Sequence, residues 1–404
     1  MIALPDSSKP LILQGHVLDG LKEIPDESIA LVCTSTPYWR QRNYGTPPQV
    51  WGGASHEHVW ATRTPGDRRP EVGNSGFMRG EVKGYYGESQ EGGCLCECGA
   101  WKGELGQEPT PELFVSHVAD VMGEVLRVLK TDGSLWLNTA STYSTHPAGV
   151  TDERRWQKST VSPKGDQGAL QSGTLDKRAE GWPEKELIPI PWMLGLEMHR
   201  RGWRIRADVQ WWKVNPKRDS AKDRPARCHE YVTMFTKGPN AYYNEEGVRQ
   251  PYSEATLKEI GISYRSESRK VMVEGKLCSM YERANAEDPS ELKRRIIKSL
   301  ASRGGSMLPD VWYLATGNGE GRHVAVFPEQ LPELCITAGS RPGDIVLDPF
   351  AGSGTTLQVA RRLGRRSIGI ELSQESVAYM GEKLARPQVA SLMGFGGTVE
   401  EGGG

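Results

Sequence analysis

The segment DIVLDPFAGSGTTLQVARRLGRRSIGIE, residues 344–371, decides the fold of this chain. Its apolar start predicts a buried strand that ends at Asp348, and the glycine-rich turn after it leads into a helical pattern through Leu363. A second apolar run then ends in Glu371, 23 residues after Asp348. Strand, glycine-rich turn, helix, strand and acid is the layout of a nucleoside-binding crevice in an α/β sheet.

Three kinds of ligand bind to such a turn, and the residues of the turn indicate which of them fits. A phosphate-binding P-loop needs a lysine after its last glycine, but Thr355 follows Gly354. A dinucleotide fingerprint needs a third glycine at the position that Leu357 occupies. S-adenosylmethionine has no phosphate, so neither residue is required for it. An ordinary tight turn is the alternative, but the acids on both sides of the turn argue against it, and we predict a site for S-adenosylmethionine.

The rest of the chain alternates between strand-like and helix-like patterns. Thr110 and Pro111 form a helix start, and Asp132-Gly133 is expected to stop that helix before the next strand. The alternation predicts an α/β fold with a doubly wound, mostly parallel sheet. The expected strands are 29–33, 134–138, 205–212 and 231–236, and the expected helices are 110–131 and 191–199.

Two insertions and a tail interrupt this pattern. Residues 45–100 are rich in glycine, proline and charge and predict a long loop, and residues 146–182 predict a mobile loop. Residues 245–306 are charged and helical in pattern, which predicts a helical insertion. The expected organisation is therefore one half of the main domain in 1–244, the helical insertion in 245–306, the nucleoside-binding half in 307–390 and a disordered tail in 391–404.

Composition excludes some classes of protein. The chain has 404 residues, 37% of them hydrophobic, and a formal net charge of -1. It contains no apolar run long enough for a membrane span and no basic stretch followed by an apolar run at its start. We therefore expect a cytoplasmic protein that has no membrane partner.

A second motif, TSTPYW at residues 34–39, directly follows the expected strand 29–33. It resembles the Ser-Pro-Pro-Tyr-Trp catalytic loop of DNA amino-methyltransferases, and DPFAGSGTT at 348–356 looks like their cofactor loop. The segment FPEQL at 327–331 is similar to the cofactor-binding segment of the same family. Because the catalytic loop precedes the cofactor loop, the chain resembles the circularly permuted β group, with a Rossmann-like methyltransferase fold.

The resemblance implies a methyl transfer from S-adenosylmethionine to the exocyclic amino group of a base that is flipped out of double-stranded DNA. The Ser35 hydroxyl and the Thr36 carbonyl are then expected to accept hydrogen bonds from the amino group, in a loop shaped by Pro37, while Tyr38 stacks on the base. The residues that the resemblance assigns to the cofactor are Phe327, Asp348, Pro349, Phe350, Gly352, Gly354, Thr355 and Glu371.

The chain also departs from the family pattern, which leaves alternatives open. Relatives carry proline where this chain has Thr36, so a catalytically impaired DNA-binding homologue is an alternative to an active enzyme. Ser35 in place of an aspartate favours cytosine N4 over adenine N6. Methylation at cytosine carbon 5 would need a Pro-Cys dipeptide, which the sequence lacks. Action on RNA or on a small molecule is a third, weaker hypothesis.

A group of metal-ligating residue types lies in the loop insertion. His56 and His58 are followed by Cys94, Cys96 and Cys98. Zinc favours four nitrogen or sulfur ligands, and a glycine-rich loop gains order from such a site. By the resemblance Cys98 is one ligand, and either Cys94 or Cys96 supplies the other thiolate. Reduced cysteines without a metal are the alternative.

Partners follow from the basic residues and from the resemblance. Residues 200–227 contain ten Lys or Arg and three Asp, which indicates either a solvated surface or a phosphate-binding face. The family favours the second interpretation, and the insertion 245–306 is then the expected target-recognition region. A cognate restriction endonuclease, or none in an orphan or phage enzyme, is the expected protein partner. The candidate DNA contacts are Lys217, Arg218, Arg224 and Arg227.

Overall fold

The computed structural model divides the chain into two compact units. One comprises Met1–Tyr242 and Asp310–Met393, and the other comprises Tyr243–Pro309 and Gly394–Gly404. Most of the loops expected at 45–100 and 146–182, most of the helical insertion 245–306 and the whole tail 391–404 lie outside the described residues. The structure describes residues 2–5, 9–42, 44–53, 56–60, 94–145, 177–179, 181–216, 219, 221–250, 252, 305–317 and 327–386.

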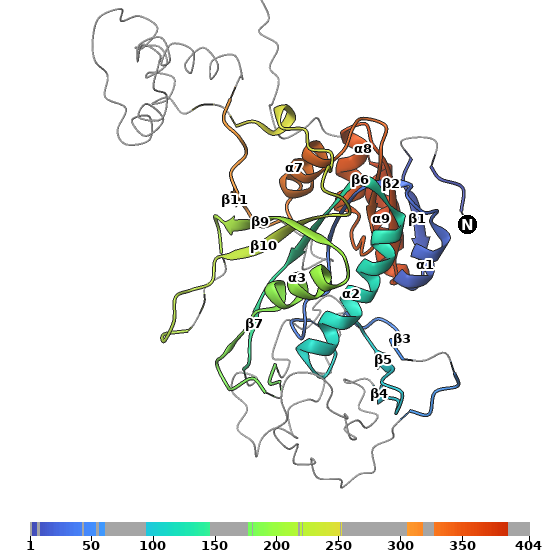
Figure 1. Ribbon diagram of the computed structural model, residues 1–404, viewed down its shortest axis with the longest axis vertical. Helices are drawn as coiled ribbons and strands as arrows, with labels where there is room; N and C mark the ends of the chain where they lie inside the picture. The colour runs from blue at the N-terminus through green and yellow to red at the C-terminus, as the bar shows by residue number, and fades with distance from the viewer. Residues whose placement is uncertain are drawn as a thin grey trace, which may run out of the picture. The chain divides into compact units, whose positions relative to one another are not determined.

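The first unit is built on an eight-stranded sheet whose strand order is β1-β13-β12-β2-β6-β10-β9-β11 (Figure 1). Only the two pairs that include β10 are antiparallel, so the sheet is mostly parallel as the sequence predicted. The strands are β1 (Leu11–Gln14), β2 (Ile29–Ser35), β6 (Leu129–Thr139), β9 (Arg204–Lys213), β10 (His229–Thr236), β11 (Val311–Leu314), β12 (Ile345–Asp348) and β13 (Arg366–Glu371).

Helices cover both faces of this sheet, which makes it doubly wound. On one face, α1 packs on Ile370 through Gly20, and α1, α2 and α3 share the main core with Val32. On the other face, α7 packs on Leu31 through Gly339, and α8 and α9 meet over the second core cluster. The helices are α1 (Val17–Glu23), α2 (Pro111–Val128), α3 (Ile190–Arg200), α7 (Gln330–Gly339), α8 (Thr355–Arg362) and α9 (Gln374–Ala385).

Helix α2 begins as the sequence predicted but ends earlier. The Thr110 side chain accepts a hydrogen bond from the Leu113 amide at 3.2 Å, and Pro111 is the first helical residue. The predicted stop at Asp132-Gly133 is wrong, because the helix ends at Val128 and both residues lie inside β6. The β2–β6 register shifts in this stretch, and a Cβ on Gly133 would lie 2.9 Å from the Ala30 carbonyl oxygen. The turn signal therefore marks an irregularity within a strand.

Two small sheets complete the described part of the first unit. In one, β3 (Gln49–Trp51) pairs with β5 (Trp101–Gly103), which pairs with β4 (Cys94–Leu95). Trp51 and Trp101 are 3% and 1% exposed and belong to the main core, so the ends of the 45–100 insertion pack on the domain. In the other, β7 (Thr142–Tyr143) pairs with β8 (Leu187–Ile188). In the second unit, the short 3-10 helix η2 (Glu246–Val248) is the element that lies within the described residues.

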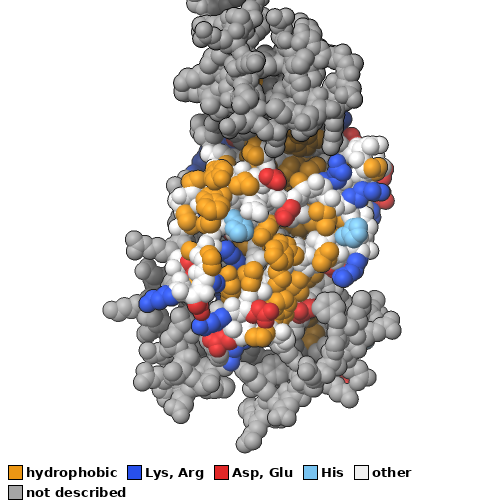
Figure 2. Space-filling model, turned by 60° about the vertical axis from the view of Figure 1, so that its left-hand side comes forward, with side chains coloured by type: hydrophobic (Ala, Val, Ile, Leu, Met, Phe, Trp, Pro, Cys, Tyr) orange, Lys and Arg blue, Asp and Glu red, His pale blue; other side chains and the backbone are white. Residues whose placement is uncertain are grey.

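Hydrophobic side chains are exposed on α3, β9 and β11. They include Trp192 and Leu196 on α3, Trp212 on β9 and Tyr313 on β11. Figure 2, which brings the left-hand side of Figure 1 forward, shows hydrophobic side chains gathered on this side, with acidic, basic and histidine side chains among them. None of the helices within the described ranges is long and apolar enough to cross a membrane.

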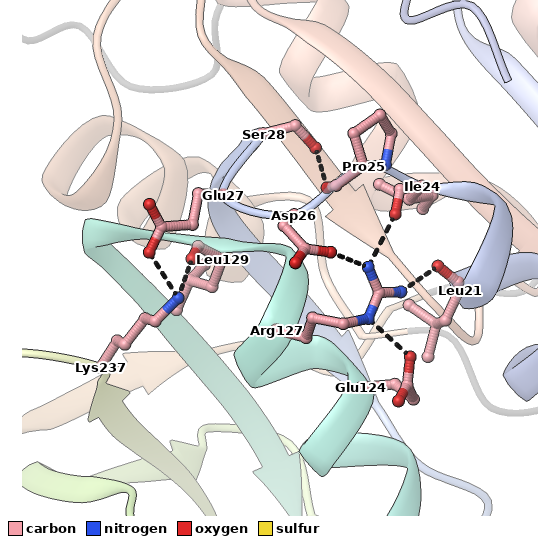
Figure 3. Close-up of polar contacts among 10 residues, drawn as sticks. All are labelled: Leu21, Ile24, Pro25, Asp26, Glu27, Ser28, Glu124, Arg127, Leu129 and Lys237. Carbon is pink, nitrogen blue, oxygen red and sulfur yellow. Dashed lines mark hydrogen bonds and ion pairs between the residues drawn. The ribbon is translucent and has the colours of Figure 1, made fainter. Parts of the chain in front are cut away.

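The edge of the sheet where β2 and β6 begin is closed by a cluster of ion pairs and backbone contacts (Figure 3). The Arg127 guanidinium donates to the carbonyl oxygens of Leu21 at 2.8 Å and Ile24 at 3.0 Å, which caps the end of α1. It also pairs with Asp26 and Glu124. These contacts join α1 to α2 at the edge opposite to the one where β2, β12 and β13 end.

Candidate active site

The two motifs singled out in the sequence meet at one edge of the sheet. Strand β2 ends at Ser35 and strand β12 ends at Asp348, and these two strands are parallel neighbours. Strand β13, which ends at Glu371, lies beside β12 in the same direction. Ligands of open α/β sheets bind outside the carboxyl ends of such strands. The arrangement therefore gathers the predicted catalytic and cofactor loops at the edge where α/β sites form.

A direct hydrogen bond joins the ends of the two strands that lead into these loops. The Thr34 hydroxyl donates to Asp348 Oδ1 at 2.6 Å, across 314 positions of sequence, and the Phe350 amide donates to the same oxygen at 3.1 Å. Asp348 is 2% exposed, and burial raises its pKa to about 6, while the hydrogen bonds from Thr34 and Thr356 oppose that rise. The carboxyl group thus fixes the start of the glycine-rich turn relative to the end of β2.

The glycine-rich turn depends on backbone conformations that favour glycine. Gly352 has φ 52° and Gly354 has φ 75°, both in the left-handed region. A Cβ on Gly354 would also lie 2.5 Å from Met380 Cγ of α9. The turn therefore lets α8 begin at Thr355 while its backbone lies against α9.

Glu371 holds the other side of this turn. Its Oε2 accepts a hydrogen bond from the Gly352 amide and its Oε1 accepts one from the Ser373 amide, each at 2.8 Å. Burial raises the pKa of this carboxyl, and the backbone amides oppose that rise. The Gly15 amide after β1 donates to the Glu371 carbonyl oxygen at 3.0 Å. The acid is thus held by backbone groups, and its two oxygens keep acceptor capacity for a ligand hydroxyl.

The remaining predicted cofactor residues differ in where they lie. Pro349 and Phe350 are part of the turn, and Phe350 packs against the main core. Thr355 is buried, and its hydroxyl accepts a hydrogen bond from Lys383 Nζ at 3.1 Å, so it faces α9. Phe327 is half-buried and lies shortly before α7.

The predicted catalytic loop starts inside the sheet. Ser35 is the last residue of β2 and is half-buried, Thr36 is 4% exposed and Pro37 is half-buried. The Tyr38 hydroxyl lies 2.6 Å from Glu230 Oε2 and 2.9 Å from Asn138 Oδ1. Burial raises the pKa of Tyr38 well above its ordinary value, and the negative charge of Glu230 adds to that rise.

Two of these partners were absent from the sequence-based site. Asn138 lies near the end of β6, and Glu230 lies at the start of the antiparallel strand β10, so both reach the same edge. The Asn138 side-chain amide donates to Glu230 Oε2 at 3.2 Å, and Lys213 Nζ contacts Glu230 Oε1. The position of Asn138 near the end of a predicted strand could have placed it at this edge from the sequence alone. Glu230 lies at the start of its strand, so placing it at the same edge required knowing that β10 is antiparallel.

A strap formed by residues 104–108 supports the loop that follows Tyr38. The two carboxylate oxygens of Glu104 accept hydrogen bonds from the amides of Tyr44 at 2.6 Å and Thr46 at 2.9 Å. The Gly106 carbonyl oxygen accepts one from the Arg40 amide at 2.7 Å. Because the strap directly follows β5, the small sheet is linked to the predicted catalytic loop.

Four side chains in the loop insertion form a group with the geometry of a metal site. The ligand atoms of His56, His58, Cys96 and Cys98 all lie within 4.8 Å of one another. Of the two cysteines left open by the sequence, Cys96 belongs to this group, whereas Cys94 lies in β4. The turn between the cysteines is closed by a hydrogen bond of 2.9 Å from the Gly99 amide to the Cys96 carbonyl oxygen. Two imidazoles and two thiols are a donor set that suits zinc.

Two of the four predicted DNA contacts, Arg224 and Arg227, lie within the described residues. The Arg224 guanidinium pairs with Asp219 at 2.6 Å and lies 3.7 Å from the centre of the Tyr143 ring. Arg227 donates to the Ser141 carbonyl oxygen, and burial lowers the pKa of its guanidinium. Lys217 and Arg218 lie outside the described residues.

Comparisons with known proteins agree with this geometry. A family model for N6/N4 methyltransferases, described as DNA methylase, matches residues 29–382. The chain is 32% identical over 284 residues to the type II methyltransferase M.SmaI of Serratia marcescens, covering 70% of this chain and 78% of that protein. It is 27% identical to the type II methyltransferase M.XycI of Xanthomonas campestris pv. cyanopsidis, covering 93% of this chain and 90% of that protein.

A solved structure shares the fold. The PvuII DNA methyltransferase, described as cytosine-N4-specific, superposes with a TM-score of 0.50 and 17% sequence identity. The match covers 95% of this chain and 90% of the other. At this level of identity the likeness bears on the architecture of the sheet and its helices.

Proposed function

Because the chain belongs to the N6/N4 family of DNA methylases and is thus an S-adenosylmethionine-dependent DNA methyltransferase, we propose that it methylates the exocyclic N4 of cytosine in double-stranded DNA. The observation that carries methyl transfer at this site is the 2.6 Å hydrogen bond from Thr34 to Asp348, which holds the ends of β2 and β12, and so the starts of the two loops, at one edge of the sheet. Adenine N6 is the alternative target, since the choice of cytosine rests on Ser35.

The cofactor side of the proposed site consists of the turn after β12 and the end of β13. When bound, S-adenosylmethionine supplies an electrophilic methyl group. The carboxylate of Glu371 is suited to accept hydrogen bonds from the ribose hydroxyls, and Gly352 and Gly354 let the backbone approach the ligand. The Asp348 carboxyl group holds the start of the turn by accepting a hydrogen bond from the Phe350 amide. Phe327 offers an apolar surface for the adenine ring.

The base side of the proposed site consists of the loop after β2. An exocyclic amino nitrogen is a poor nucleophile because its lone pair is delocalised into the ring. The Ser35 hydroxyl and the Thr36 carbonyl oxygen accept hydrogen bonds from the amino group, which favours a tetrahedral nitrogen whose lone pair is available. Tyr38 provides a ring on which the flipped base stacks. Positioning and local electrostatics, rather than a covalent enzyme intermediate, supply the rate.

The names of the similar proteins support a role in a restriction–modification system. We propose a cognate restriction endonuclease as partner in the cell, and an orphan enzyme as the alternative. In the DNA complex, Lys217, Arg218, Arg224 and Arg227 would contact phosphates, and the insertion 245–306 would select the target sequence. Replacing one phosphate-contacting cation would reduce the slope of the logarithm of the binding constant against the logarithm of salt concentration by about one.

The test of this function uses purified protein, labelled S-adenosylmethionine and plasmid DNA from a host without DNA methylation. We expect label in duplex DNA, N4-methylcytosine in the digested nucleosides and one recognition sequence by methylation-sensitive sequencing. N6-methyladenine would refute the cytosine assignment. DNA binding without transfer would favour the impaired homologue, and stronger labelling of RNA would refute the choice of DNA.

We also propose that His56, His58, Cys96 and Cys98 bind a structural zinc ion. Metal analysis of the purified protein is then expected to give about one zinc per chain. Replacing Cys96 with Ser removes a ligand and should abolish stoichiometric zinc, whereas Cys94→Ser, two residues away, should leave it bound. Equal zinc content in the two variants, or none in the wild type, would refute the site.

A further inference from the structure

A network of four polar side chains lies beside the proposed catalytic loop. Glu230 is 8% exposed, and its Oε2 accepts hydrogen bonds from the Tyr38 hydroxyl at 2.6 Å and from the Asn138 amide at 3.2 Å. Its Oε1 pairs with Lys213 Nζ. The four residues come from the loop after β2 and from β6, β10 and β9, so the network exists only when the sheet is assembled.

The network suits the task of orienting an aromatic ring. A tyrosine ring has two torsions, and a hydrogen bond at its far end restricts both of them. A bond from a hydroxyl to a carboxylate is charge-assisted and stronger than one between neutral groups. Lys213 supplies the opposite charge that a buried carboxylate needs, and Asn138 restricts the second side of the same oxygen.

The Tyr38 hydroxyl remains a donor at neutral pH. Burial, and then the charge of Glu230, hold the pKa of Tyr38 well above its ordinary value, while the Arg227 guanidinium opposes this rise. The phenol therefore keeps its proton, and the bond to Glu230 persists.

We infer that Glu230 is a positioning residue for methyl transfer, which sets the angle of the Tyr38 ring against the flipped base. It acts through Tyr38, whose hydroxyl donates to Glu230 Oε2, and its other contacts are with Asn138 and Lys213. The inference rests on the proposed function, in which Tyr38 stacks on the target base. A purely structural ion pair is the competing explanation.

The experiment is a double-mutant cycle between Tyr38→Phe and Glu230→Ala, with Glu230→Gln as the conservative variant. The kcat is measured on a duplex that carries the recognition sequence found by sequencing. We expect Glu230→Ala to lower kcat roughly tenfold to a hundredfold and Glu230→Gln to restore part of it, since Gln still offers an acceptor oxygen. In the Tyr38→Phe background, which has no hydroxyl to hold, both Glu230 variants should have the same kcat.

A second readout separates positioning from stability. With 2-aminopurine at the target position, a flipped base gains fluorescence and stacking on a ring quenches it. We expect Glu230→Ala to change this emission while the affinities for DNA and S-adenosylmethionine remain within about twofold. Glu197→Ala, which removes an ion-paired carboxylate on α3, serves as the control and should leave the emission unchanged.

Two outcomes would overturn the inference. One is a Glu230→Ala variant that melts at a lower temperature but keeps wild-type kcat and emission. The other is a double variant whose loss is the product of the two single losses, which would mean that Glu230 acts independently of Tyr38. A wild-type protein that transfers no methyl group to DNA would instead refute the proposed function itself, and this inference with it.

Discussion

At the scale of single residues, the site contains a buried acid that is costly to ionise. Asp348 is 2% exposed, and burial raises its pKa to about 6 from the ordinary 3.8. The folded protein therefore binds this proton more tightly than the unfolded chain does. The stability that the group contributes is full below the unfolded pKa and is lost as the pH rises through the folded pKa.

This behaviour predicts a difference between the wild type and Asp348→Asn. An asparagine oxygen still accepts the bonds from Thr34 and Phe350 but does not titrate. Between pH 4 and 6 the unfolding free energy of the wild type should fall relative to the variant, by on the order of 3 kcal/mol. Urea denaturation at a series of pH values measures the difference. Parallel curves for the two proteins would contradict the prediction, because the other titrating groups are common to both.

At the scale of elements, the junction between the glycine-rich turn and α8 is held by packing as well as by backbone conformation. Gly354 and Gly364 flank the helix with similar φ angles of 75° and 72°. A Cβ on Gly354 would lie 2.5 Å from Met380 Cγ, whereas a Cβ on Gly364 meets nothing within 4 Å. The two positions therefore separate the cost of the left-handed conformation from the cost of the clash with α9.

We expect Gly364→Ala to lose about 1 kcal/mol of stability, from the left-handed conformation alone. Gly354→Ala should lose a further 1–3 kcal/mol or so, because α9 must move, and it should also weaken binding of S-adenosylmethionine. Denaturant titration and calorimetric binding check both variants. If the two alanines cost the same stability and leave the affinity unchanged, the packing of α8 on α9 does not constrain the turn.

At the scale of the whole molecule, the two edges of the sheet have different tasks. The proposed active site occupies the edge where β2, β12 and β13 end, and the Arg127 cluster of Figure 3 closes the opposite edge. Arg127 is 29% exposed as a side chain and satisfies two carbonyl groups at the end of α1. We therefore expect substitutions at the first edge to affect methyl transfer and substitutions at the second edge to affect stability.

Replacing Arg127 with Gln should therefore lower the unfolding free energy by about 2 kcal/mol, since the carbonyl oxygens of Leu21 and Ile24 lose charged donors. The kcat and the cofactor affinity of the folded protein should stay at wild-type values. Lys22→Ala is a suitable control, because its ion pair with Asp19 is exposed and contributes less than about 0.5 kcal/mol. A fall in kcat for Arg127→Gln at temperatures where it remains folded would contradict this separation of the two edges.

Local pattern in the sequence was sufficient for the central strands and for the α/β class, whereas the two outer strands β1 and β11 were not among the expected elements. The apolar run before Asp348 and the glycine-rich turn predicted β12, α8 and the acid at the end of β13. This works because buried strands and helices place apolar residues at a characteristic spacing along the chain. The same reasoning failed at Asp132-Gly133, where a typical turn signal lies within a strand. There, pairing of β6 with β2 outweighs the local preference.

By itself, the sequence determined the mostly parallel α/β class and the order of the two loops, and its motifs pointed to the family. Only the tertiary structure decided that Thr34 and Asp348 touch, that Cys96 and not Cys94 joins the metal-ligand group, and that Glu230 holds Tyr38. The physical reason is that the spacing of apolar residues along the chain shows which positions are buried. These contacts depend instead on which strands lie side by side and in which direction each one runs.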